Sequence, residues 1–143
     1  MRTARVALGW LAFLVIPLVL AASTKGRVIR PDDPPPSQNA KARMEAARKT
    51  YEYNWNKLRG TESQDVEQVH RWSRRWAEAQ QHVSNKKPDQ TAAVEAHLDR
   101  MKTLEMTVKA QLDAGVKFTV ADVSAVEFYR LEAEDWARRI KGK

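Results

Sequence analysis

Two stretches of this sequence repeat one pattern of apolar residues at helical spacing, and this repeat is the strongest constraint on the fold. One stretch begins at Asp65 and the other at Asp122. Residues three and four apart lie on one face of an α-helix, so the repeat predicts two equivalent helices that each bury one face. The matching positions are Val66/Val123, Val69/Val126, Trp72/Tyr129, Trp76/Ala133, Ala79/Trp136 and Val83/Ile140.

A further apolar run precedes each of these helices and ends at a glycine, Gly60 in the first case and Gly115 in the second. Glycine is favoured just after a helix, where the backbone often takes a left-handed conformation with positive φ. We therefore expect an all-α fold of two tandem helix-turn-helix hairpins, with repeats at about 40–84 and 89–141, forming an antiparallel four-helix bundle or coiled coil. The runs consist of Met44, Ala47, Tyr51, Trp55 and Leu58, and of Val94, Leu98, Met101, Leu104, Val108 and Leu112.

Residues that favour the start of a helix occur in both predicted turns and between the hairpins. Thr119 and Asp122 have the spacing of a capping box, in which each side chain bonds the backbone N–H of the other residue, and Thr61 and Gln64 offer a comparable pair. Pro88 is the only proline after Ala40 and suits the first turn of a helix, where no N–H is needed.

The N-terminal segment has the pattern of a targeting or anchoring sequence. Arg2 and Arg5 precede an uncharged run that ends in small residues. Residues 1–24 are therefore predicted to be a signal peptide or an uncleaved N-terminal membrane anchor. Residues 25–39 are rich in proline and are predicted to be an extended linker. We expect residues 40–143 to fold as one duplicated domain. The protein would be exported, and either periplasmic or tethered to the inner membrane facing the periplasm.

The composition limits the chemistry that is possible, and solvated outer helix faces with ion pairs account for most of the charged residues. The chain has no Cys, which excludes disulfides and thiolate sites. Its 25 Lys and Arg against 18 Asp and Glu give a net charge of +7, but the charges are spread over the predicted helices. A solvated outer face with ion pairs one helical turn apart accounts for them. The expected pairs are Glu67/Arg71, Arg74/Glu78, Arg130/Glu134 and Glu134/Arg138.

The stretch HRWSRRW, residues 70–76, combines aromatic and basic residues as a membrane-surface site would. On a helix, however, Trp72 and Trp76 fall on the apolar stripe, whereas the arginines fall beside or opposite it, namely Arg71, Arg74 and Arg75. We expect the tryptophans to pack between the hairpins and the arginines to form a solvated rim. A membrane-surface face is the alternative.

The histidines are the residues best suited to a metal site. Glu67 and His70 have the Glu-x-x-His spacing of di-iron bundles, but the fourth helix carries Arg130 where a second His would fall. His82 and His97 flank the Pro88 turn and offer a two-histidine surface site, although exposed histidines are more often simply solvated. No nucleophile with a positioned base and no Gly-rich phosphate loop is recognisable. We therefore predict no catalytic, cofactor or metal site, and no enzymatic activity.

The loop pattern of a helix, a glycine, an Asp-Val pair and a second helix resembles the internal repeat of the TolC-like outer-membrane efflux family. The sequences AEAQ at 77–80 and RLEAE at 130–134 belong to this resemblance, which covers residues 40–141. It implies antiparallel helical hairpins assembled as coiled coils in the periplasm. The chain is too short for an efflux channel and lacks strand segments for a barrel, so transport is not implied.

Together these features predict a non-enzymatic, envelope-associated helical interaction or scaffold module. Its partner would be an envelope protein or a second copy bound through helical faces. The membrane would be a partner only if the N-terminal segment is uncleaved, and nucleic acid is not expected. The alternatives are a periplasmic metal- or stress-sensing bundle and an efflux accessory protein.

Overall fold

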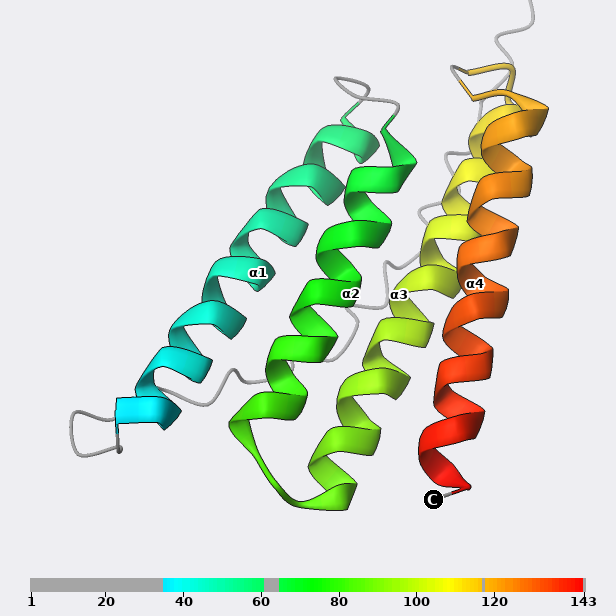
Figure 1. Ribbon diagram of the computed structural model, residues 1–143. Coiled ribbons are helices and arrows are strands. Elements are labelled where there is room, and N and C mark those ends of the chain that lie inside the picture. Colours follow the sequence, from blue (N-terminus) through cyan, green and yellow to red (C-terminus); the bar gives the residue numbers. More distant parts are fainter. Residues whose placement is uncertain (1–34, 61–64, 117, 143) are drawn as a thin grey trace, which may run out of the picture.

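The computed structural model describes residues 35–60, 65–116 and 118–142, and this part of the chain contains four helices and no strand. The helices are α1 (Pro35–Arg59), α2 (Val66–Val83), α3 (Lys87–Asp113) and α4 (Val120–Lys141). The predicted all-α fold of two antiparallel hairpins is confirmed (Figure 1). The predicted segment 1–24 lies outside the described residues.

The helices lie side by side in the order of the sequence, with alternating directions (Figure 1). α1 packs against α2, α3 packs against α4, and the interface between α2 and α3 joins the two hairpins. Among the described residues, no Cα atom of α1 comes within 8 Å of one in α3 or α4. α1 and α4 therefore form the two edges of an open array and do not close it into a ring.

The first helix begins earlier than the sequence pattern indicates. It starts at Pro35, inside the segment 25–39 that was expected to be an extended linker, so that expectation is wrong for its last five residues. The reason is that proline fixes a helical φ and lacks only an N–H that the first turn does not use. Pro88 occupies the same kind of position at the start of α3, as predicted.

The two glycines end their helices in different ways. Gly115 has a φ of 68° and Val116 N–H donates to Gln111 O at 2.9 Å, which is the Schellman pattern of a left-handed helix end. Gly60 does not have positive φ, so the prediction of a left-handed conformation is wrong there. Its N–H donates to Asn56 O at 2.8 Å and continues the helical ladder. Glycine accepts either sign of φ, and its presence alone does not decide the conformation.

The caps of the second helix in each hairpin also differ. Asp122 N–H donates to Thr119 Oγ1 at 3.3 Å and Thr119 N–H donates to Asp122 Oδ2 at 2.8 Å, so the predicted capping box at α4 is confirmed. The pair Thr61 and Gln64 lies outside the described residues. α2 is capped by Asp65, whose Oδ1 accepts from Gln68 N–H at 3.0 Å.

The apolar repeat forms the inner faces of the array, as predicted. None of its twelve residues is exposed, and Val69, Val126 and Ala133 are at most 1% exposed. The preceding helices contribute residues that are fully buried, among them Leu58, Val94, Met101, Leu104 and Val108. Within the described residues, no helix has the length and apolar character needed to cross a membrane.

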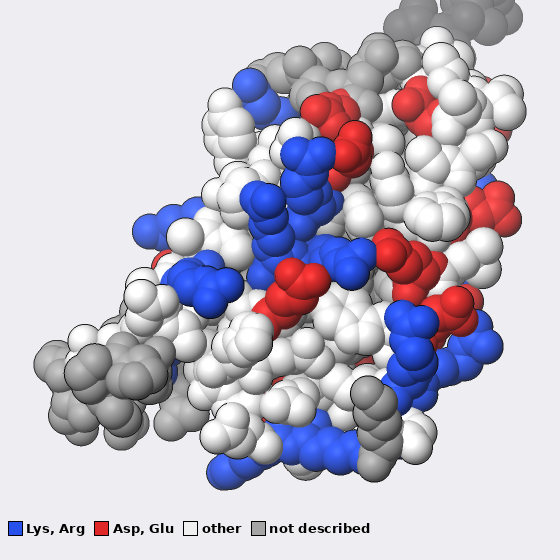
Figure 2. Space-filling view, in the orientation of Figure 1, with Lys and Arg blue, Asp and Glu red and all other residues white. Residues whose placement is uncertain are grey.

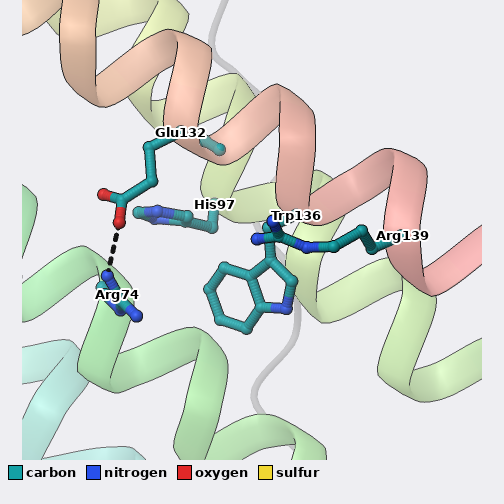
Figure 3. Close-up of a pocket in the computed structure, with 6 residues that line it drawn as sticks. Arg74, His97, Glu132, Trp136 and Arg139 are labelled. Atoms are coloured by element: carbon teal, nitrogen blue, oxygen red, sulfur yellow. Dashed lines mark hydrogen bonds and ion pairs between the residues drawn. The ribbon is translucent and has the colours of Figure 1, made fainter.

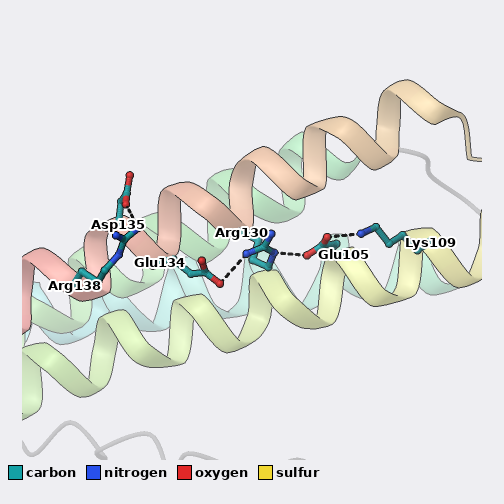
Figure 4. A network of polar contacts seen from close by, with 6 residues as sticks. All are labelled: Glu105, Lys109, Arg130, Glu134, Asp135 and Arg138. Atoms are coloured by element: carbon teal, nitrogen blue, oxygen red, sulfur yellow. Dashed lines mark hydrogen bonds and ion pairs between the residues drawn. The ribbon is translucent and has the colours of Figure 1, made fainter.

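An ion-pair network connects α3 and α4 along the edge of their interface (Figure 4). Arg130 Nε donates to Glu105 Oε2 at 2.5 Å, and its Nη1 donates to Glu134 Oε1 at 2.7 Å. Lys109 Nζ donates to the other oxygen of Glu105 at 2.6 Å. Burial alone would raise the pKa of Glu105, but these two cations hold it below its usual value.

Three of the four predicted ion pairs are confirmed. They are Glu67/Arg71, Arg74/Glu78 and Arg130/Glu134. The fourth is wrong, because Arg138 pairs with Asp135 and not with Glu134, whose carboxylate is engaged by Arg130.

Candidate functional site

Two histidines meet in the interior where α2, α3 and α4 come together. His97 on α3 is 2% exposed, and its ring centroid lies 6.0 Å from that of His70 on α2. The ring of His70 stacks on Tyr129 of α4 at 4.0 Å with nearly parallel planes. The ring of His97 meets Trp136 of α4 edge-on at 5.6 Å. We call these four residues, together with the residues that hydrogen-bond or pair with one another beside them, the polar junction. The additional residues are Ser73, Arg74, Arg100 and Glu132.

A chain of hydrogen bonds crosses from α3 to α2 in the polar junction. Arg100 Nε donates to Ser73 Oγ at 2.7 Å, and Ser73 Oγ lies 2.8 Å from His97 Nδ1. A guanidinium can only donate, so the Arg100 bond uses one acceptor site of the Ser73 hydroxyl and leaves its hydrogen available for His97 Nδ1. A neutral His97 that carries its hydrogen on Nε2 would accept this hydrogen at Nδ1. Burial and the adjacent Arg100 charge lower the pKa of His97 to about 3, which agrees with a neutral ring.

Arg100 holds a positive charge in the interior without a carboxylate partner. In the part of the chain that the structure describes, no carboxylate oxygen lies within salt-bridge distance of it, although Nη2 also donates to Ser73 O at 3.3 Å. The guanidinium lies 4.1 Å from the ring centroid of Trp76 and 5.5 Å from that of Tyr51. Burial lowers the pKa of Arg100 to about 10, which leaves it charged at neutral pH. Arg100 therefore ties α3 to aromatic rings of both helices of the first hairpin through cation–π contacts.

A carboxylate of α4 completes the junction on its outer side. Arg74 Nη1 donates to Glu132 Oε1 at 2.8 Å, which links the two hairpins. His70 Nε2 lies 3.3 Å from Glu132 Oε2, but this nitrogen has no aligned hydrogen bond. Burial lowers the pKa of His70, and the nearby Glu132 charge partly opposes that shift.

A small pocket of about 100 Å³ opens beside these groups (Figure 3). The bond between Arg74 and Glu132 borders it on one side, and Trp136 and Arg139 of α4 lie on the other. His97 and Ala133 also line it. A pocket of this size holds a few water molecules but no drug-sized ligand.

The pair Ser73 and His97 was not recognised from the sequence, and its geometry is that of a nucleophile beside a base. Ser73 is 0% exposed, and its oxygen already accepts a hydrogen bond from Arg100. The oxygen is closed off from solvent in this structure, and its hydrogen bonds join α2 to α3. The signal available in the sequence was a polar residue within each apolar stripe, Ser73 between Val69 and Trp76, and His97 between Val94 and Met101.

The other histidine proposals are not assembled in the structure. His97 is buried and His82 is exposed, so the suggested two-histidine surface site is wrong. Glu67 is exposed and pairs with Arg71, whereas Arg130 faces Glu105. Among the described residues no group of three or more His, Asp or Glu is placed to hold a metal ion.

The two tryptophans of HRWSRRW have different positions. Trp76 is 8% exposed and packs between α1 and α3, as predicted for a residue between the hairpins. Its ring centroid lies 5.7 Å from that of Tyr51, and the Arg100 guanidinium lies over the Trp76 ring. Trp72 is half-buried and lies in the groove between α1 and α2, so the prediction is wrong for this residue. Arg74 and Arg75 are exposed, as expected, and Arg75 covers the Trp72 ring at 4.6 Å.

No family model, no curated protein and no solved structure matches this chain.

Proposed function

We propose that this chain is a non-enzymatic, envelope-associated helical interaction or scaffold module. The observation that carries the proposal is the outward face of α4. Val120 is 73% exposed, Phe128 62% and Leu131 46%. At 100° per residue these three side chains lie within one quadrant of the helix, with Ser124 between them.

This face has no covering element within the described residues, because α4 is an edge of the open array. In Figure 2, the upper right of the molecule shows mostly uncharged residues and no cluster of Lys and Arg. Large apolar side chains that share an exposed helix face are typical of surfaces that pack against another helix. The C-terminal half of α4 carries Asp135, Arg138 and Arg139, so the apolar area is confined to its first three turns.

Two further features support the proposal, one for an interaction module over an enzyme and one for a location at the cell envelope. In the polar junction, Ser73, Arg74 and His97 are engaged in hydrogen bonds within the chain. The uncharged run behind Arg2 and Arg5 favours export or membrane anchoring. The partner is an envelope protein or a second copy of this chain, and an efflux accessory role is supported by the TolC-like resemblance alone.

The test is a charge placed on the outward face of α4. In the variant Phe128→Lys/Leu131→Lys, co-purification of partners from envelope extracts and self-association in sedimentation velocity should both be lost. Met106→Lys is the matched control, because Met106 is a 65% exposed apolar residue on α3. Retention of the wild-type assemblies by the α4 variant, or an equal loss in the control, would remove the proposal.

A second candidate function, stress sensing through the histidines, is favoured by the adjacent rings of His70 and His97. In that case the stress is acidification, because protonation would place positive charge beside Arg74 and Arg100. A metal-sensing role would require micromolar binding of zinc or copper in calorimetry. A protein that neither changes its assembly at pH 5 nor binds these ions is not a sensor of this kind.

A further inference from the structure

A groove of about 390 Å³ lies between α1 and α2. Its walls are formed by Ala46 and Ala47 of α1 and Ala79 of α2, with the half-buried indole of Trp72 among them. Facing alanines leave open the space that longer side chains fill elsewhere in a helical interface. The hollow is therefore a direct result of small residues at facing positions.

The rim of the groove carries two arginines that have no ion-pair partner among the described residues. Arg43 and Arg75 line it, and within the described residues neither has a carboxylate within salt-bridge distance. Arg75 lies over the Trp72 ring at 4.6 Å. Glu78 also lines the groove, but Arg74 Nε donates to its carboxylate at 3.0 Å. Figure 2 shows a group of Lys and Arg side chains near the middle of this face of the molecule.

We propose that this groove binds an acidic peptide segment of a partner protein. Carboxylates of the segment pair with Arg43 and Arg75 at the rim, and an apolar side chain between them enters the hollow against Trp72. This inference rests on the proposed function, since it gives the chemistry of a partner for the interaction module. It uses the edge of the array opposite to the outward face of α4.

The shape of the groove favours a peptide over an anionic membrane surface. Trp72 is half-buried between two helices and lies under Arg75, so a flat surface reaches the rim but not the indole. The Glu78 carboxylate at the same rim opposes a uniformly negative surface, whereas a peptide can place its carboxylates only where Arg43 and Arg75 lie.

The experiment measures binding of a fluorescein-labelled peptide of alternating glutamate and leucine to the full-length chain by fluorescence anisotropy. The variant Arg43→Gln/Arg75→Gln should weaken binding about tenfold, because two charged contacts are lost. Arg59→Gln/Arg139→Gln is the matched control, since it removes the same charge from exposed positions outside the groove and should bind like the wild type. Ala46→Leu should also abolish binding by filling the hollow, whereas Ala42→Leu, one turn earlier on α1, should not.

Three outcomes would overturn the inference. The first is equal loss of binding in both arginine double variants, which would indicate a non-specific charge effect. The second is binding that Ala46→Leu leaves intact. The third is that Arg43→Gln/Arg75→Gln weakens binding to phosphatidylglycerol vesicles but leaves binding to the peptide unchanged. That result would assign the groove to a membrane. Loss of the α4-dependent assemblies with intact peptide binding would concern the proposed function alone.

Discussion

Acidification should destabilise this protein through His97. The imidazole is 2% exposed and faces three positively charged or protonatable groups, Arg100, His70 and Arg74. Its pKa is lowered to about 3 in the folded protein, first by burial and then by these charges. In the unfolded chain a histidine has a pKa of about 6.5. The unfolded state therefore takes up a proton at this residue well above the pH at which the folded state does.

The size of the effect follows from this difference. A lowered histidine pKa gives a stabilisation that is complete above the unfolded pKa and is lost as the pH falls toward the folded pKa. One pH unit within this window corresponds to about 1.4 kcal/mol, so the step from pH 7 to pH 5 costs about 2 kcal/mol in the free energy of unfolding. The pKa of His70 is lowered as well, which acts in the same direction. The lowered pKa values of Glu45 and Glu105 act only at lower pH.

The assay is urea unfolding of the full chain at pH 7 and pH 5, followed by circular dichroism. His97→Gln should lower stability at pH 7 but should reduce the loss between the two pH values by about 2 kcal/mol. His82→Gln is the control, because it removes an imidazole that is exposed to water in the folded protein, and it should keep the wild-type difference. A wild-type protein that loses no more free energy of unfolding than His97→Gln would refute the assignment of a buried neutral ring.

Two substitutions test the packing and the turn geometry. Trp76→Ala should lower the free energy of unfolding by about 3–5 kcal/mol, because the ring is buried between α1 and α3. Trp72→Ala should lower it clearly less in the same urea titration, because Trp72 is only half-buried. Equal costs would contradict their different positions. Gly115→Ala should lower the free energy of unfolding by about 1 kcal/mol. The cost comes from the φ of 68° alone, since an added Cβ would meet no atom within 4 Å. Gly142→Ala is the control and should change the thermal midpoint little. An unchanged midpoint for Gly115→Ala would argue against the left-handed helix end.

The buried faces of the helices could be predicted from the sequence because they depend on one local quantity, the helical period. Val69 and Val126 are equivalent in the repeat, and both are fully buried. The end of α3 at Gly115 could be predicted for the same reason, because it depends on the conformation of a single residue. Gly60 shows the limit of that reasoning, since its N–H continues the helical ladder and a glycine imposes neither sign of φ.

The polar junction could not be predicted because it depends on how α2 and α3 are aligned along each other. The bond between Ser73 and His97 joins residues 24 positions apart, and a shift of one helical turn would separate them. The same holds for the bridge from Arg74 to Glu132. A periodic pattern indicates which face of a helix is buried but not which neighbour covers it. For this reason Trp72 was assigned to the wrong interface, and the open order of the array was not foreseen.

The open order of the helices also determines how the chain acquires its structure. Each helix packs mainly on the one before or after it, so the tertiary contacts join segments that are near in sequence, and helical proteins of this type fold within microseconds to milliseconds. Among the described residues, the Cα atoms of α1 approach only those of α2, so we expect the first hairpin to form its main interface without help from the second. Tyr51 and Trp76 both belong to the first hairpin, so the aromatic surface that Arg100 contacts comes entirely from that hairpin, and the guanidinium links the second hairpin to it.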